Sequence, residues 1–118
     1  KLGDVIDHES LLTRCLNKVD FAERMLKLYQ DHCAEELRGL DLAFEHGDYD
    51  AVKRIAHRVA GASANAAATG MRARATELRQ AVESGSLESA RDQLISLHRE
   101  WDKLTSAMAG ICLQPSPS

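Results

Sequence analysis

The sequence contains few residues that interrupt helices and few that favour strands. Both prolines lie in the last four positions, so residues 1–114 contain no obligate helix breaker. Valine, isoleucine and threonine together number only 13, whereas alanine and leucine number 32. Because β-branched residues favour strands and alanine and leucine favour helices, this composition predicts an all-α protein.

Cysteine is scarce, and the histidines show no metal-binding spacing. Cys15, Cys33 and Cys112 are an odd number, are widely spaced and form no Cys-x-x-Cys pair. They therefore indicate reduced, mostly buried thiols rather than a disulfide framework or a zinc knuckle. The sequence has no His-x-x-x-His, and no glutamate stands three residues before a histidine. We expect no metal and no cofactor bound by this chain itself.

Long apolar runs are also missing. The longest uncharged interior segment, Val59–Met71, has 13 residues with Ser, Asn and Thr among them, which is too short and too polar to cross a bilayer. The chain begins at Lys1 and shows no signal-peptide pattern, so we expect a cytoplasmic piece of a longer polypeptide without direct membrane insertion. A net charge of −3 and a pI near 5.9 disfavour nucleic-acid binding.

Apolar residues recur at helical spacing through most of the chain. Asp7 fits the cap of a short first helix, and Asp20 with Glu23 resembles a capping box for a helix over residues 21–46. Gly47 fits a left-handed C-terminal cap, and Asp48 fits the N-cap of a third helix that runs to about residue 65. The second helix has the apolar stripe Phe21, Met25, Tyr29, Leu40 and Ala43, which Leu26, Leu37 and Phe44 widen on one side. The other apolar stripes are Leu11, Leu12, Cys15 and Leu16 in the first helix; Val52, Ile55, Ala56, Val59 and Ser63 in the third; Met71, Ala75, Leu78 and Val82 in the fourth; and Leu87, Ala90, Leu94, Leu97, Trp101, Leu104, Met108 and Ile111 in the last.

Very short turns connect the four longer helices, so each helix must lie antiparallel to its neighbour. The sequence therefore predicts an up-down-up-down four-helix bundle with a short extra N-terminal helix that covers one end. We expect this bundle to form one domain over residues 1–114. Residues 115–118, Pro-Ser-Pro-Ser, are predicted to be a disordered tail or a linker stump.

Four of the five histidines have an ordinary structural explanation. His32 falls within the apolar stripe of the second helix and His98 follows a predicted core leucine, so both are predicted to pack against the helices with one ring nitrogen hydrogen-bonded. His8 is predicted to lie on the surface. His46 sits at the end of a helix, where a cation interacts favourably with the helix dipole.

His57 differs from the other histidines. At 100° per residue, it lies about 160° from the centre of the apolar face of its helix and so points to solvent. Ala60, Gly61 and Ala64 follow at about one turn and two turns, so the ring would stand above a low surface that another protein could approach. Glycine in mid-helix costs about 1 kcal/mol relative to alanine. Because Gly61 also faces away from the core, close approach by a partner protein explains this glycine better than close packing of a neighbouring helix. The alternative for His57 is an ordinary solvated histidine with no function.

The basic residues gather in the same part of the chain. Residues 51–80 contain six basic side chains and one acidic side chain, a local net charge of +5. Lys53 precedes His57 by one turn on the same face and is placed to bind an anion attached to the ring, with Arg54 and Arg58 close by. No aromatic residue interleaves with these cations, which disfavours nucleic acid as the partner. An ordinary solvated face is the alternative.

The run Ala-His-Arg-Val-Ala-Gly-Ala-Ser-Ala-Asn at residues 56–65, preceded by Gly-Asp-Tyr at 47–49 and a long helix from Phe21, resembles a histidine-containing phosphotransfer (HPt) domain of bacterial two-component phosphorelays. The resemblance extends over about residues 5–111. It implies that His57 accepts a phosphoryl group from the aspartate of a response-regulator receiver domain and passes it to another receiver. It also implies that Mg²⁺ and the reactive aspartate belong to the receiver. The phosphate-binding and docking residues would be Lys53, Arg54, Arg58, Ala60, Gly61 and Ala64.

The chain departs from the family pattern at two positions. Ala60 stands where the family usually has a lysine, and Ala67 stands in a turn where it often has a glycine. The first change removes an expected phosphate contact, and we hypothesise that Lys53, and less directly Arg54 or Arg58, supplies the missing charge. The second change affects only the geometry of the turn.

Two other functions are compatible with the sequence. The chain could be a helical bundle used only for protein interaction, with His57 as a bystander. It could also be the phosphoacceptor domain of a chemotaxis-type kinase, which takes its phosphoryl group directly from a kinase domain. In the favoured interpretation the domain is a carrier rather than an enzyme, and it belongs to a hybrid sensor histidine kinase.

Overall fold

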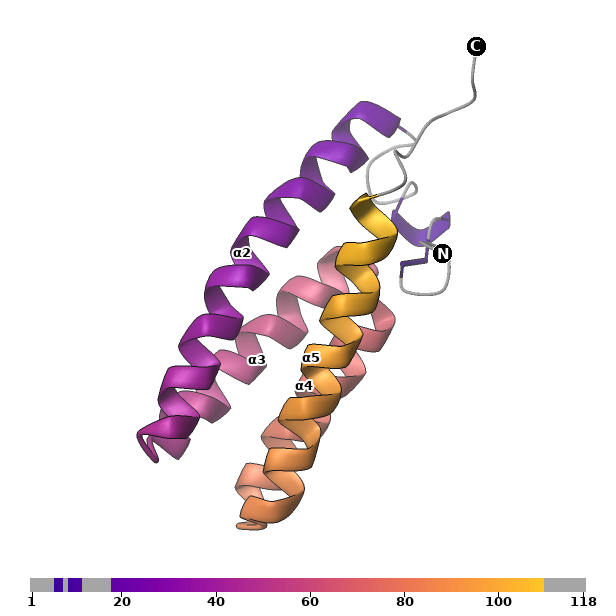
Figure 1. Cartoon of the computed structure of the whole chain (residues 1–118). Coiled ribbons are helices and arrows are strands. Elements are labelled where there is room, and N and C mark those ends of the chain that lie inside the picture. The colour runs from indigo at the N-terminus through magenta and orange to yellow at the C-terminus, as the bar shows by residue number, and fades with distance from the viewer. Residues whose placement is uncertain (1–5, 8, 12–17, 110–118) are drawn as a thin grey trace.

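The described residues of the computed structural model are 6–7, 9–11 and 18–109, and within these ranges every regular element is a helix. This confirms the all-α class that the composition predicts. The four long helices are α2 (Val19–Glu45), α3 (Tyr49–Asn65), α4 (Thr69–Glu83) and α5 (Leu87–Ala109) (Figure 1).

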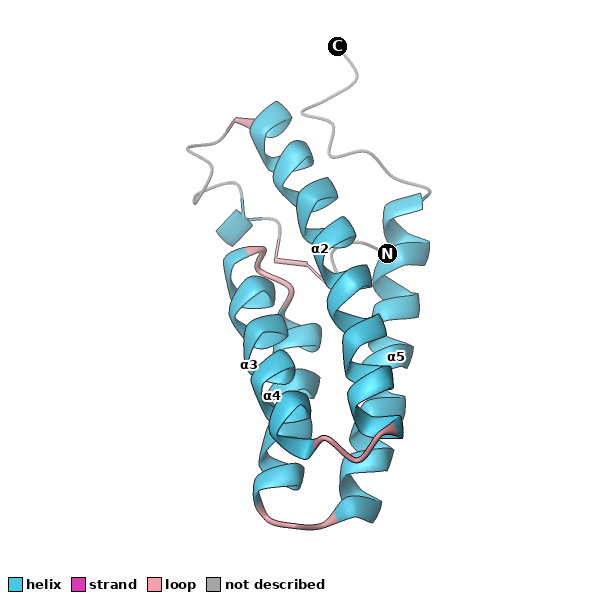
Figure 2. Ribbon diagram, turned by 90° about the vertical axis from the view of Figure 1, so that its left-hand side faces the viewer, coloured by secondary structure: helices cyan, strands magenta, loops and turns pink. Residues whose placement is uncertain are grey.

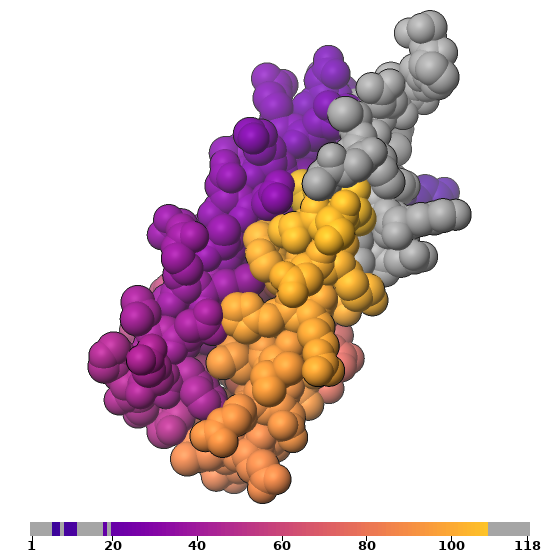
Figure 3. Space-filling model, in the orientation of Figure 1, coloured from indigo at the N-terminus to yellow at the C-terminus, as the bar shows by residue number. Residues whose placement is uncertain are grey.

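Consecutive helices form the closest backbone packing in the molecule: α2 packs with α3, α3 with α4, and α4 with α5. Figure 2 shows α3 and α4 together on one side and α2 and α5 on the other. Helices α2 and α5 also fill most of the face seen in Figure 3. In this view the helices group as α3 with α4 and α2 with α5, and we use these two pairs below to compare regions of the molecule. The α3–α4 pair contains nearly all of the basic segment 51–80.

The turns after α2, α3 and α4 share one geometry. Each contains a residue with positive φ, which is Gly47 (71°), Ala67 (58°) and Gly85 (80°) in turn. The N–H groups of this residue and of the next one donate to carbonyl groups in the last turn of the preceding helix. The left-handed cap predicted at Gly47 is therefore confirmed. Ala67 adopts the same conformation even though its Cβ disfavours it.

Two of the predicted N-terminal caps are confirmed and one is wrong. The carboxylates of Asp7 and Asp48 each accept a hydrogen bond of 3.1 Å from the backbone N–H three residues later. In contrast, α2 begins two residues earlier than predicted, with Lys18 at the N-cap position and no side-chain cap. Asp20 therefore lies inside the first turn, where its charge still interacts favourably with the helix dipole.

The predicted apolar stripes of α3 and α4 are confirmed, because all nine of their residues are buried. Ser63 is the polar member of the α3 stripe, and its hydroxyl shares a hydrogen bond of 2.7 Å with the hydroxyl of Tyr29. The Tyr29 ring packs edge-on against Trp101, with 6.3 Å between the ring centroids. Burial raises the pKa of Tyr29, so the hydroxyl stays protonated. These contacts connect α2, α3 and α5 through the core.

The stripe predicted for α2 is confirmed at Leu26, Tyr29, Leu37 and Leu40 but is wrong at Phe21. The buried face of this helix is formed by Ala22, Leu26, Tyr29, Cys33, Leu37 and Leu40. Phe21 is 44% exposed because this face is rotated by one residue from the predicted one. For the same reason His32 is exposed rather than packed.

The stripe of α5 is also less regular at its start, and one ring nitrogen of His98 is hydrogen-bonded, as predicted. Leu87, the first residue of α5, is 44% exposed, since a helix end has fewer neighbours than its middle. His98 is half-buried, and its Nε2 lies 2.8 Å from Oδ1 of Asp41 on α2. This ring therefore connects two helices through a polar contact and does not pack into an apolar interior.

The cysteine and membrane predictions can be compared with the structure only in part. Cys33, which lies within the described residues, is a buried free thiol, as predicted, and burial raises its pKa to about 11. Among residues 6–7, 9–11 and 18–109, no helix is long and apolar enough to span a membrane. The predictions that lie outside these ranges concern His8, Leu12, Cys15, Leu16, Ile111, Cys112 and the tail at 115–118.

Candidate functional site

His57 lies on the exposed side of α3, as its angular position predicts. The opposite side of the helix fixes this orientation, because Ala56 and Val59, its neighbours in the core, are 0% exposed. The Asp48 cap also fixes the start of the helix. A rotation of α3 that turned His57 inward would expose these apolar side chains, so the ring is held toward solvent by the packing of the core.

The surface beside His57 is low. Gly61 is exposed, and a Cβ placed on it would meet no atom within 4 Å. Ala60 and Ala64 are half-buried and carry only a methyl group each. Since no neighbouring helix approaches Gly61, its lack of a side chain does not serve packing within the molecule. The structure thus has a shallow surface of small residues next to an exposed imidazole.

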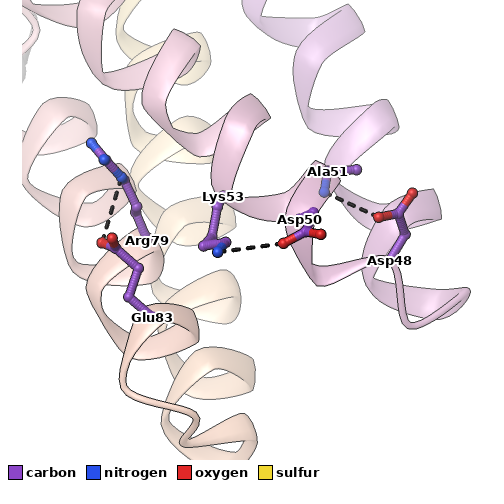
Figure 4. Close-up of polar contacts among 6 residues, drawn as sticks. All are labelled: Asp48, Asp50, Ala51, Lys53, Arg79 and Glu83. Carbon is purple, nitrogen blue, oxygen red and sulfur yellow. Dashed lines mark hydrogen bonds and ion pairs between the residues drawn. The ribbon is translucent and has the colours of Figure 1, made fainter.

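Arg79 of α4 makes the direct contact with the His57 ring. Its Nη1 lies 2.9 Å from Nδ1 of His57. A guanidinium has only N–H donors, so Arg79 donates and Nδ1 accepts. The Nε of the same side chain lies 3.5 Å from Oε1 of Glu83, one turn further along α4 (Figure 4).

The sequence pattern includes Arg79 among the six basic side chains of residues 51–80 but does not place it beside His57. The α3–α4 turn is the signal that could have found it. His57 precedes Ala67 by ten residues and Arg79 follows it by twelve, so a tight helical hairpin brings the two side chains to similar heights. His57 and Arg79 are therefore 22 residues apart in the sequence but in contact in the structure.

Lys53 lies one turn before His57, but its ammonium group is paired elsewhere. Its Nζ is 3.4 Å from Oδ1 of Asp50, as Figure 4 shows. The Asp50 side chain is 89% exposed, and such exposed pairs contribute about 0–1 kcal/mol. The structure does not bring Lys53 into contact with the ring, although this weak pair leaves Lys53 able to exchange its partner.

Arg58 and Arg54 are placed differently from each other. Arg58 reaches across to α2 and forms two hydrogen bonds with the Glu36 carboxylate, of 2.7 Å from Nε and 3.2 Å from Nη2. These bonds raise the pKa of the Arg58 guanidinium. Arg54 is exposed, and no hydrogen bond or ion pair joins it to another side chain in the described part of the chain. Arg58 therefore connects helices, whereas Arg54 is available to an approaching protein.

The arrangement supplies a nucleophile and nearby cations. Neutral imidazole is a nucleophile near pH 7, and guanidinium and ammonium groups stabilise anions placed beside it. Within residues 6–7, 9–11 and 18–109, no group of three or more His, Cys, Asp or Glu side chains could hold a metal ion. The chemistry that these residues offer is therefore covalent capture of an electrophile that carries negative charge.

A comparison with protein-family models identifies the family of this chain. The family model described as Hpt domain matches residues 24–108, a range that contains His57, all of α3 and α4 and most of α2 and α5. Comparisons with curated proteins and with solved structures give no match. The family match extends over well more than half of the sequence. The chain therefore belongs to the Hpt domain family, whose members are histidine-containing phosphocarriers of two-component signalling that interact with the receiver domains of response regulators.

Proposed function

We propose that His57 is the phosphoacceptor of this Hpt domain and that it carries a phosphoryl group between two receiver domains. The observation that carries the proposal is the position of His57, exposed on α3 beside the small-residue surface at Gly61 and inside the family match. A receiver needs such a surface because its phosphorylated aspartate must reach the ring in line with the bond that breaks.

The transfer step requires little covalent chemistry from the carrier. An imidazole nitrogen of His57 donates its lone pair to phosphorus, and a nitrogen–phosphorus bond forms. The phosphorus–oxygen bond to the receiver aspartate breaks, and its electron pair stays on the aspartate carboxylate. The return step onto a second receiver reverses these changes. Mg²⁺ is expected on the receiver, and the carrier provides a fixed ring and a docking face.

In this proposal Lys53 supplies the positive charge that the lysine position of the family, here Ala60, lacks. Its exposed pair with Asp50 is weak enough to be exchanged for a phosphoryl oxygen. Replacement of Lys53 by alanine should then slow transfer from a cognate receiver. An unchanged transfer rate in Lys53→Ala would show that this side chain does not take the role.

The docking face comprises the small residues Ala60, Gly61 and Ala64 together with the nearby Arg54 and Arg58. The small residues permit close approach, and the exposed Arg54 attracts an acidic receiver, an effect that salt weakens. Arg58 adds charge while it holds α3 to α2 through Glu36.

The proposal also includes the wider setting predicted from the sequence. The chain is a module of a hybrid sensor histidine kinase in the cytoplasm, and it needs no metal ion of its own. Its architecture is an antiparallel up-down-up-down four-helix bundle with a short N-terminal helix. The consecutive packing of α2 to α5 and the three short turns support this topology.

The test is phosphorylation of the wild type, His57→Gln and His98→Gln by a phosphorylated receiver and, separately, by a small phosphodonor. Wild type and His98→Gln should acquire an acid-labile phosphoryl group, because only the first substitution removes the proposed nucleophile. Circular dichroism of all three proteins controls for folding.

The outcomes separate the alternative functions. If the wild type acquires no label from any donor, the domain serves interaction alone and the proposal is wrong. If a kinase domain labels His57 but no phosphorylated receiver does, the chain is the phosphoacceptor domain of a chemotaxis-type kinase. Equal labelling of His57→Gln and the wild type would place the phosphoacceptor at another residue.

A further inference from the structure

The contact between Arg79 and His57 determines which ring nitrogen carries the proton. A neutral imidazole has one N–H and one lone pair, and Nδ1 must present the lone pair because Arg79 can only donate to it. The proton of the neutral ring is therefore on Nε2. Among the described residues, Nε2 of His57 has no hydrogen-bond partner, so it is the nitrogen that a phosphodonor can reach.

This arrangement is not ready for phosphoryl transfer. The accessible nitrogen, Nε2, carries a proton and has no free lone pair, while the lone pair on Nδ1 is covered by the guanidinium. Attack by Nε2 requires the proton on Nδ1, and a protonated Nδ1 cannot accept a hydrogen bond from Arg79.

We propose that Arg79 is a positioning residue that restrains His57: it holds the ring in the unreactive tautomer and must leave Nδ1 before the ring is phosphorylated. This inference rests on the proposed function of His57 as the phosphoacceptor. Arg79 lies on α4, outside the Lys53, Arg54 and Arg58 set on α3, and its role is to keep the ring unreactive until a partner has docked.

Glu83 can keep its ion pair with Arg79 after the guanidinium has left the His57 ring. Its carboxylate already lies 3.5 Å from Nε of Arg79, on the other edge of the guanidinium from the His57 contact. The Arg79 side chain is 42% exposed, so it can move without disturbing the core. An acidic receiver that docks beside Gly61 would attract the guanidinium away from the ring.

The proton and electron changes of the release are balanced. Once Arg79 leaves, water takes the proton from Nε2 and another water delivers a proton to Nδ1, so the ring stays neutral. The lone pair now on Nε2 then forms the bond to phosphorus, and the electron pair of the breaking phosphorus–oxygen bond remains on the receiver aspartate. The proton on Nδ1 remains on the phosphorylated ring.

The direct test is the tautomer of the ring, read from the two ¹⁵N chemical shifts of the His57 imidazole in alkaline buffer, where free imidazole is neutral. The wild type and Arg79→Lys should show an unprotonated Nδ1, because both side chains only donate. Arg79→Ala should shift the ring toward protonated Nδ1. A wild-type ring with its proton on Nδ1 would overturn the proposal.

A chemical probe tests the consequence for reactivity. Diethyl pyrocarbonate is a neutral electrophile that acylates the free lone pair of histidine, so it is not steered by the charge of Arg79. We expect Arg79→Ala to react at His57 about fivefold faster than the wild type, as expected for loss of one exposed charge-assisted hydrogen bond. Arg79→Lys should react at the wild-type rate, and peptide mass spectrometry locates the adduct.

A small phosphodonor adds the functional measurement. Arg79→Ala should be phosphorylated about fivefold faster than the wild type, and Arg72→Ala, which removes the same charge from an exposed position on α4, should not be faster. Slower labelling of Arg79→Ala than of Arg72→Ala would show that Arg79 assists the reaction instead of restraining it. The proposed function can fail independently of this inference. If the His57 ring has the expected tautomer but no donor phosphorylates it, the Arg79 contact is confirmed and His57 is not the phosphoacceptor.

Discussion

The two helix pairs of this domain carry equal numbers of cations but very different numbers of acids. The α3–α4 pair has six basic and three acidic side chains, and the α2–α5 pair has six basic and eleven acidic ones. The uneven distribution of carboxylates therefore gives the α3–α4 pair a net charge of +3 and the α2–α5 pair a net charge of −5. A partner with an acidic surface is attracted to the α3–α4 side and repelled by the other.

His57 and His98 reflect the same division. On the basic pair, His57 accepts a hydrogen bond from Arg79, whereas on the acidic pair His98 contacts the Asp41 carboxylate. A carboxylate accepts, so Nε2 of His98 donates to Asp41 and the ring connects α5 to α2. His57 makes no contact with a carboxylate in the described part of the chain, and its Nε2 has no hydrogen-bond partner there.

The largest effect is expected from filling the low surface on the basic pair. Gly61→Trp places an indole beside His57 and should slow phosphorylation by a receiver about 100-fold, since small misplacements of reacting groups have effects of this size. The protein should stay folded, because a Cβ at Gly61 meets no atom within 4 Å. The rate of receiver-dependent labelling at saturating receiver gives the measurement.

The matched control places the same indole on the acidic pair. Arg91 is exposed on α5, and Arg91→Trp should leave the transfer rate unchanged within twofold, as expected for a surface substitution away from the docking face. Equal losses in the two variants would show that the receiver does not distinguish the pairs. Labelling by a small phosphodonor should survive in both.

The second effect concerns the contact that joins the pairs through the core. Tyr29→Phe removes the hydrogen bond with Ser63 and leaves a buried hydroxyl without its partner, which should lower the free energy of unfolding by about 1–2 kcal/mol. Urea unfolding with an unchanged m-value measures it. Tyr49→Phe is the control, because Tyr49 is half-buried and its ring packs on Phe44. If both variants lose the same stability, the buried hydrogen bond does not hold α2 to α3.

The third prediction reverses one charge on each pair. Arg54→Glu on α3 should reduce the association rate with an acidic receiver about fivefold at low salt, and the difference from wild type should shrink at high salt. Arg91→Glu on α5 introduces the same change far from His57 and should have a smaller effect. Stopped-flow association at several salt concentrations tests this, and equal slowing in both variants would remove Arg54 from the docking face.

The smallest effect is expected at the turn between α3 and α4. Ala67→Gly relieves an unfavourable positive φ, a gain of about 1–2 kcal/mol, but loses a buried methyl group, a cost of about 0.8 kcal/mol. The net change in unfolding free energy should therefore be a stabilisation of less than about 1 kcal/mol. A clear destabilisation by Ala67→Gly would show that packing of the methyl group dominates the turn.

The sequence predicted the α3–α4 pair better than the α2–α5 pair, for a physical reason. In α3 and α4 every buried position is apolar or small, so the helical spacing of these residues identifies the side that faces the core. The same spacing shows that His57 lies on the opposite side of α3. In α2, the apolar residues Phe21 and Leu28 are exposed although buried residues lie close to them in the sequence. The apolar pattern of α2 therefore does not determine which side of the helix faces the core, and for this reason His32 was wrongly predicted to be packed. Arg79 was missed because periodicity describes one helix at a time and carries no information about the register between helices.

Site mapping of the phosphorylated domain tests the central claim most directly. The wild-type protein is incubated with a phosphorylated receiver and digested at neutral to alkaline pH, and its peptides are read by mass spectrometry. Our account predicts a phosphoryl adduct on the peptide that contains His57 and none on the peptides that contain His32 or His98. An adduct on either of those peptides, or no adduct on the His57 peptide while the receiver loses its phosphoryl group to the domain, would contradict it.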